Sequence, residues 1–294
     1  MRWREAVVRA AFLAPAAAFL LLFLGRPLVD NLTASLRAAT VSSLLDDEAP
    51  FIGPDNHLSL LRSEAFREAL ATTALYTAGS LAAQFSVGLG LALFFHRRFP
   101  LGRTIRALLL LPWLMPLVVT GTVWRWMLET DGGAVNGVLR ALHLVHAGVP
   151  WLTGDDEALV SAVLVNTWVG VPFATALLYG GLQSVPRHVH EAALLDGAGP
   201  VSLFRYVTWP LLRPTAGVVL VLGAVYTLRS PDVVLALTGG GPAGATRTLA
   251  VLAYEQSFLE FDFGRAAATG NVLVLVASVL ALLQLRAGRR ARTF

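Results

Sequence analysis

The sequence contains no cysteine and no lysine, and it is poor in charge of either sign. Without cysteine the chain has no disulfide, no thiol nucleophile and no cysteine-ligated metal. All 23 basic residues are arginines, and charged residues make up 14% of the 294 positions, compared with roughly 25% in soluble domains. Hydrophobic residues make up 55%, and the mean hydropathy is +0.64. We therefore expect a membrane protein in which most residues face lipid or other helices.

The sequence also lacks the arrangements that carry catalysis. His188 and His190 lie two positions apart, so on a helix they face different directions and do not share a metal. No Ser/His/Asp arrangement and no carboxylate pair is evident, and the turn Gly-Gly-Gly-Pro at 239–242 lacks the Lys and Ser/Thr of a phosphate-binding loop. We therefore expect no catalytic residues, no metal and no cofactor bound by this chain, which is predicted not to be an enzyme.

Long apolar segments predict an all-α polytopic membrane protein with about six transmembrane helices. The expected spans are about 11–36, 69–95, 107–128, 159–183, 211–238 and 266–285, and the third is expected to be broken by Pro112 and Pro116. They form a transmembrane domain over 11–286, between a leader at 1–10 and a tail at 287–294.

The first span has features of its own. Arg26 and Asp30 are spaced to pair at i, i+4 on one helix face. The apolar run 12–24 also has the length of a signal-peptide core, although no small-x-small cleavage site follows it. Both a retained span and a cleaved signal peptide therefore stay open.

Arginines gather on one side of the expected membrane. The leader, 96–106, 184–213 and the C-terminal segment 286–294 share a side and hold 14 arginines with only three acidic residues. The other 16 acidic residues lie on the opposite side or near that end of the spans. Because arginine-rich loops remain cytoplasmic, both termini and 184–213 are expected in the cytoplasm. This asymmetry accounts for the pI near 10.1 without any nucleic-acid partner.

The stretch 184–213, between the fourth and fifth spans, predicts a compact helical hairpin. Pro186 can occupy the first helical position, where its missing N–H costs nothing. Gly197 stands where a glycine with positive φ ends a helix, and Pro200 starts the next one. Small-sided positions recur on one face of the first helix at Val189, Ala192, Ala193 and Asp196.

The same residues resemble a known family. Glu191-Ala-Ala, then Gly197, then Val207, Trp209 and Pro210 are similar in type and spacing to the "EAA" signature of ABC-importer permeases. Trp209 stands where the family has an aliphatic residue. The resemblance implies the type I ABC-importer permease fold and a coupling helix that docks into a groove on an ATPase subunit. The implied coupling residues are Glu191, Ala192, Ala193, Asp196, Gly197 and Pro210.

A second resemblance follows the fifth span. The glycine-rich turn 238–242, the segment 245–249, Tyr254 and Phe258 resemble carbohydrate-importer permeases of the maltose and glycerol-phosphate group. The resemblance implies a multi-pass subunit of the bacterial plasma (inner) membrane that forms half of a pathway for a sugar or sugar-like solute. The implied partners are a second permease subunit in a heterodimer, two ATPase subunits that bind ATP and Mg, and an extracytoplasmic solute-binding protein.

Polar and amphipathic residues at membrane depth are candidates for the substrate pathway, and each could equally pack between helices. Pro231 predicts a kink or break in the fifth span, and Arg229 and Asp232 are expected to share a face on which they could pair. Polar groups on a broken helix are tolerated there only against protein or a water-filled cavity. The candidates are Asn166, Trp168, Tyr179, Tyr226, Arg229, Asp232 and Asn271.

Two other interpretations stay open. Permeases for other solutes, such as amino acids or peptides, share the EAA stretch, although the glycine-rich turn argues against them. A secondary transporter would need ion-coupling carboxylates deep in its spans, and no inverted repeat is evident. The sequence does not identify which sugar is carried.

Overall fold

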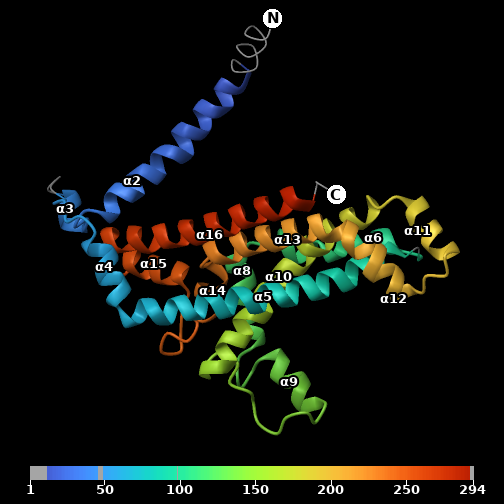
Figure 1. Ribbon diagram of the computed structural model, residues 1–294. Helices are drawn as coiled ribbons and strands as arrows, with labels where there is room; N and C mark the ends of the chain where they lie inside the picture. The colour runs from blue at the N-terminus through green and yellow to red at the C-terminus, as the bar shows by residue number, and fades with distance from the viewer. Residues whose placement is uncertain (1–11, 46–48, 98, 292–294) are drawn as a thin grey trace, which may run out of the picture. The chain divides into compact units, whose positions relative to one another are not determined.

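A computed structural model describes residues 12–45, 49–97 and 99–291 of the chain, and every regular element among them is a helix. Figure 1 shows these helices with the labels used here. The expected leader at 1–10 and the end of the expected tail at 292–294 lie outside the described residues.

Five helical stretches of the described chain are long and apolar enough to cross a membrane. They are Phe12–Ser35, Glu64–His96, Asp155–Gln183, Pro200–Arg229 and Phe263–Arg286. A sixth crossing is present if Gly102–Leu114 and Leu117–Met127 form one broken span. The predicted all-α membrane fold with about six spans is therefore confirmed.

The third predicted span, 107–128, is a bent series of short helices. It comprises α6 (Gly102–Leu109), α7 (Leu111–Leu114) and α8 (Leu117–Met127), and the chain bends by 95° before α8. Met115 is extended, with φ −75° and ψ 140°, because proline at the next position disfavours the helical conformation there. The predicted break is confirmed at Pro116, whereas Pro112 is accommodated in the first turn of α7.

The helices of the fifth predicted span, 211–238, begin before it and are interrupted near its end. Helical structure begins at Pro200 and runs through α12 (Pro200–Leu203), a π-helical turn η2 (Phe204–Thr208) and α13 (Trp209–Arg229). It ends at Arg229, because Ser230 precedes a proline and adopts φ −102° and ψ 110°. A separate short helix, α14 (Asp232–Leu237), follows. The predicted kink or break at Pro231 is thus confirmed as a break, which ends the helix.

The chain divides into two compact units, each considered by itself. One comprises Met1–Phe66 with Leu252–Val272, and the other comprises Arg67–Val251 with Leu273–Phe294. The remaining helices are η1 (Leu21–Gly25), α2 (Arg26–Ser35), α3 (Val41–Leu45), α4 (Asp55–Arg62), α5 (Glu64–His96), α9 (Ala134–Ala141), α10 (Asp155–Gln183), α11 (Arg187–Leu195), α15 (Leu249–Phe258) and α16 (Phe263–Ala291).

In the first unit, asparagine amides hold irregular backbone together. Asn56 is buried, and its Nδ2 donates to the carbonyl oxygens of Ser35 and Arg37 at 3.0 and 2.9 Å. These bonds satisfy carbonyls at the C-terminal end of α2 that have no partner within the helix. The predicted Arg26–Asp30 pair is confirmed, with 3.8 Å between Nε and Oδ2.

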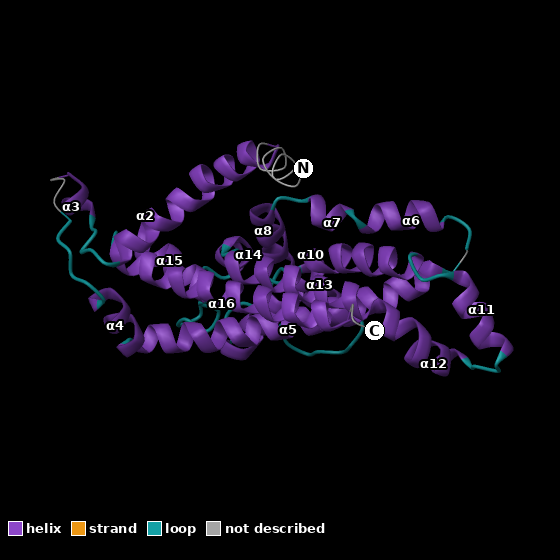
Figure 2. Ribbon diagram, turned by 45° about the horizontal axis from the view of Figure 1, so that its top comes forward, coloured by secondary structure: helices purple, strands orange, loops and turns teal. Residues whose placement is uncertain are grey.

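In the second unit, α5, α10 and α13 share a core, and Figure 2 shows these helices side by side. Ala92 of α5, Leu178 of α10 and Leu212 of α13 are fully buried in it. Small residues on the facing surfaces allow the helices to pack closely. Gly170 of α10 is one such position, because a Cβ added there would lie 2.3 Å from the side-chain amide carbon of Gln84. This packing fixes the positions of the helix ends that carry both sites described next.

The cytoplasmic location of the hairpin is a prediction that single cysteines can test, because the chain has none of its own. His188 is exposed on α11 and Val138 is exposed on α9, which lies in the loop expected outside. Val138→Cys is expected to react with a membrane-impermeant maleimide added to intact cells, and His188→Cys only with a permeant one. Reaction of position 188 with the impermeant reagent would contradict the topology.

Candidate functional site

The hairpin between the fourth and fifth spans forms as a helix, a tight turn and a second helix. α11 begins at Arg187 and not at the predicted Pro186, which instead is the preceding N-cap residue with φ −64° and ψ 132°. Gly197 has φ +83°, so its predicted positive φ is confirmed. The turn is closed by hydrogen bonds from Gly197 N to Leu194 O and from Ala198 N to Ala193 O, at 3.1 and 2.9 Å.

The hairpin carries apolar side chains that are exposed and that have polar residues around them. α11 has no buried residue, and Leu195 and Val201 are 89% and 77% exposed. Five of the six predicted coupling residues lie on α11 or in its turn, whereas Pro210 lies in the first turn of α13. Exposed apolar side chains rimmed by polar ones are typical of a protein-binding surface.

Two contacts tie the hairpin to the spans. His190 Nε2 lies 3.1 Å from Oγ1 of the buried Thr208, which joins α11 to the π-helical turn. Trp209 packs edge-on against Phe85 of α5, with 6.3 Å between ring centroids. The aromatic ring at the family's aliphatic position therefore contacts α5. Neither His190 nor Thr208 was among the sequence candidates, and only the spacing of a hairpin could have suggested that they meet.

A cavity of about 340 Å³ lies among α5, α7, α8, α10, α13 and α14 in the second unit. It brings together four of the seven predicted pathway residues, namely Asn166, Tyr226, Arg229 and Asp232. This grouping joins positions that are more than 60 residues apart in the sequence.

One wall of the cavity is aromatic. The ring centroids of Trp113 and Phe173 are 5.8 Å apart, and those of Phe173 and Tyr226 are 5.9 Å apart in an edge-to-face arrangement. The guanidinium of Arg229 lies 5.3 Å from the centre of the Tyr226 ring. Trp113 and Phe173 were not predicted as site residues, because aromatic residues in apolar spans are indistinguishable from packing residues in sequence.

The lining also carries amide and hydroxyl groups. Gln84 Nε2 donates to the backbone oxygen of Asn166 at 3.0 Å, and Asn166 Nδ2 donates to Thr227 Oγ1 at 3.2 Å. Gln84 both packs against Gly170 and lines the cavity. A glutamine inside a span is the signal that could have identified it, since buried polar groups in membranes are costly.

The predicted pairing of Arg229 with Asp232 is wrong. Both residues are described, and no ion pair within 4.0 Å joins them. Asp232 Oδ2 instead accepts a hydrogen bond from Ser230 Oγ at 2.6 Å. The physical reason is the break at Pro231, which removes the continuous helix that would have placed the two residues on one face.

The other three predicted pathway residues do not line this cavity. Trp168 packs edge-on against Trp124, with 5.8 Å between ring centroids. Tyr179 accepts a hydrogen bond from Arg106 at the far end of α10. Asn271 exchanges hydrogen bonds with Asn31 and Ser35 within the first unit, so its amide is used in packing.

Comparison with known proteins agrees with this geometry. Residues 84–293 match the family described as "Binding-protein-dependent transport system inner membrane component". The chain belongs to this family. The chain is therefore a permease subunit of an ABC transporter in the inner membrane. It is not an enzyme, since the ATPase of such a transporter is a separate subunit.

Individual relatives cover nearly the whole chain. The trehalose/maltose transport system permease protein MalF of Thermococcus litoralis is 30% identical over 99% of this chain and 97% of its own length. The sulfoquinovosyl glycerol transport system permease protein SmoG of Agrobacterium fabrum is 32% identical over 91% of this chain and 87% of its own.

A solved structure shows the same fold. Two crystal structures of a bacterial ABC transporter for the acidic polysaccharide alginate match with TM-scores of 0.81 and 0.80 at 22% identity. They cover 99% of this chain, and 99% and 98% of the matching chains. The type I permease fold that the EAA resemblance implied is thus confirmed.

Proposed function

We propose that the chain is the membrane-spanning subunit of an ATP-driven importer for a sugar or sugar-like solute, and that it forms half of the translocation pathway. The observation that carries the substrate class is the cavity, whose lining combines aromatic rings with amide and hydroxyl groups. Aromatic faces and a few placed polar groups suit a ligand that has both C–H faces and many hydroxyls. The names of the relatives, which include trehalose/maltose and sulfoquinovosyl glycerol permeases, support this class.

The proposal includes partners that complete the transporter. They are a second permease subunit, two ATPase subunits that bind ATP and Mg, and an extracytoplasmic solute-binding protein. The exposed face of α11 offers the surface for an ATPase subunit. One of the matching alginate transporter structures is of a complex with a periplasmic protein that carries an alginate pentasaccharide, which supports the last partner.

The helix that leaves the hairpin supports a route for coupling. Pro200–Arg229 is helical throughout, so at 1.5 Å per residue it is about 45 Å long. It begins in the hairpin and ends at Tyr226 and Arg229 in the cavity wall. A displacement of the hairpin by ATP-driven closure of the ATPase dimer would therefore reach the cavity through one helix. Import requires that the inward- and outward-open states bind the solute differently.

The test is to express the chain with the ATPase, second permease and binding protein from neighbouring reading frames. We expect an ATPase subunit to co-purify, and sugar-loaded binding protein to raise ATP hydrolysis by at least about tenfold over unloaded protein, a difference of about 1.4 kcal/mol in activation. Uptake into vesicles driven by an ion gradient without ATP would contradict the proposal and favour a secondary transporter. Stimulation by amino acids or peptides alone would overturn the substrate class.

A further inference from the structure

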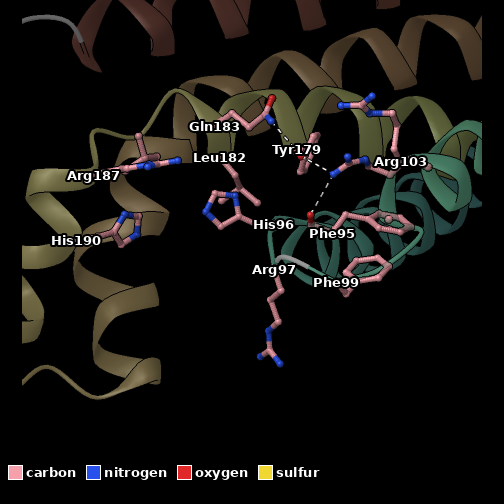
Figure 3. A pocket seen from close by; sticks show the side chains of 13 residues that line it. Phe95, His96, Arg97, Phe99, Arg103, Tyr179, Leu182, Gln183, Arg187 and His190 are labelled. Atoms are coloured by element: carbon pink, nitrogen blue, oxygen red, sulfur yellow. Dashed lines mark hydrogen bonds between the residues drawn. The ribbon is translucent and has the colours of Figure 1, made fainter.

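A second cavity, of about 470 Å³, lies where α5, α6, α10 and α11 end or begin. Six of its lining residues are basic or can become so, and none of its lining residues is acidic. We call it the basic pocket, and Figure 3 shows it from close by. Its basic residues are His96, Arg97, Arg103, Arg106, Arg187 and His190.

Specific contacts hold the side chains of the basic pocket in place, so it is more than a cluster of charged residues at the surface. Arg106 Nη1 donates to the Tyr179 hydroxyl at 2.6 Å and to the Phe95 backbone oxygen at 3.4 Å, and its guanidinium lies 4.8 Å from the centre of the Tyr179 ring. Gln183 Nε2 donates to the same hydroxyl at 3.0 Å. The hydroxyl therefore accepts two hydrogen bonds, and its own hydrogen is left to donate to an acceptor in the pocket.

The cations of the pocket lack carboxylate partners. Within the described part of the chain, Arg103, Arg106 and Arg187 form no ion pair. Figure 3 shows His96, Arg187 and His190 approaching one another on one side, whereas the Arg97 side chain extends away from them. Like charges at close range repel, so the empty pocket is electrostatically unfavourable and an anion would relieve it.

We propose that the basic pocket binds a phosphate group, supplied by an acidic phospholipid headgroup or by a soluble phosphate anion, and that this anion holds α11 against the ends of α5 and α10. Arginine forks match phosphate oxygens in geometry as well as charge. Basic pockets between helices on the cytoplasmic side bind acidic lipid headgroups, and the hairpin is expected on that side. Arg187 and His190 belong to α11, while His96 and Tyr179 belong to α5 and α10.

The anion matters for coupling because α11 has little else to hold it. The helix contains no buried residue, and its side-chain bond to the rest of the unit runs from His190 to Thr208. A bridging phosphate would make α11 move with the spans instead of independently. This consequence, unlike the binding itself, rests on the proposed role of α11 as the coupling helix.

The test measures amide hydrogen exchange in 187–195 of the assembled transporter complex in nanodiscs, without ATP. One arm compares phosphatidylcholine alone with a mixture containing about one third phosphatidylglycerol. The other arm adds millimolar inorganic phosphate, against chloride at equal ionic strength, in phosphatidylcholine alone. Amide exchange is expected to slow by about tenfold in at least one arm. This is the ratio of exchange rates expected when the concentration of the anion is about ten times its Kd. Slowing with the lipid assigns the headgroup, and slowing with phosphate assigns the soluble anion.

Two sets of variants distinguish anion binding in the basic pocket from a general effect of positive charge on the surface. Arg103 and Arg187 are exposed, so Arg103→Gln with Arg187→Gln is expected to preserve the fold and to remove the slowing. Arg205→Gln with Arg213→Gln is the control, because it removes the same two charges from exposed positions of the 184–213 stretch that do not line the pocket, and it is expected to change exchange by less than about twofold.

Three results would overturn the proposal. They are no slowing in either arm, an equal loss of slowing in the Arg205→Gln/Arg213→Gln control, or full protection in phosphatidylcholine without phosphate, which would mean that a partner's side chain fills the pocket. Because no ATP is turned over, none of these results bears on whether loaded binding protein stimulates ATP hydrolysis.

Discussion

Gly197→Val is expected to abolish import while the partner ATPase still hydrolyses ATP. Gly197 holds φ +83°, and no atom lies within 4 Å of the position where a Cβ would be added. The cost therefore comes from the backbone alone, at about 1–2 kcal/mol for an L-residue in the left-handed region, and β-branching makes valine a poor fit there. The turn would relax and change the direction from α11 to α12. Import by the complex in proteoliposomes and its ATP hydrolysis are the two measurements.

Gly199→Val is the matched control, because it places the same side chain two residues away. Gly199 has φ −72° and ψ 168°, which is extended backbone that valine adopts readily before Pro200. No atom lies within 4 Å of its added Cβ either. We expect near-normal import from this variant. Glu191→Arg reverses an exposed charge on the proposed docking face and is expected to uncouple, whereas Glu191→Gln keeps its shape. Normal import by both Gly197→Val and Glu191→Arg would refute the coupling role.

The sequence predicted those features that depend on local backbone chemistry. Gly197 and the proline break at Pro116 were correct because glycine and proline restrict their own residue and the one before it. The spans were identified because a run of about 20 apolar residues is typical of a transmembrane helix. These rules act over only a few residues. They therefore did not predict that the helix of the fifth span begins at Pro200 or that it ends at Arg229. Pro231 was recognised, but a proline does not say whether a helix kinks or stops.

The cavity could be predicted only in part, because its members come from six helices. Asn166, Tyr226 and Asp232 were found as polar groups at depth, a property of single positions. Trp113 and Gln84 were missed because their inclusion depends on how each helix is rotated against its neighbours. That rotation follows from side-chain packing across the bundle, and the periodicity of apolar residues along a single helix does not reveal it. The hydrogen bonds of Asn271 show the converse, a polar residue at depth that serves packing.

Arg229→Met and Asp232→Asn are each expected to lower import by about tenfold or more, equivalent to at least 1.4 kcal/mol, while the complex still assembles. Arg229 covers the Tyr226 ring and Asp232 accepts the Ser230 hydroxyl, so each has its own partner in the cavity wall. Asparagine can still accept that hydroxyl, so Asp232→Asn tests the charge alone. Because no ion pair joins the two residues, the double variant is not expected to regain what either single variant loses. Sugar uptake and complex yield are measured together.

The Arg26–Asp30 ion pair of the first span provides the control for the Arg229 and Asp232 variants. Arg26 and Asp30 form an ion pair at 3.8 Å with side chains 77% and 67% exposed. Such a pair contributes about 0–1 kcal/mol, so Arg26→Met with Asp30→Asn is expected to leave import and yield near normal. If the Arg229/Asp232 double variant regains import, the two charges compensate each other structurally despite their separate partners. If only its yield falls, with normal import per assembled complex, the two residues stabilise the fold and do not belong to the pathway. Loss of import at normal yield, with the first-span variant unaffected, places both residues in the pathway.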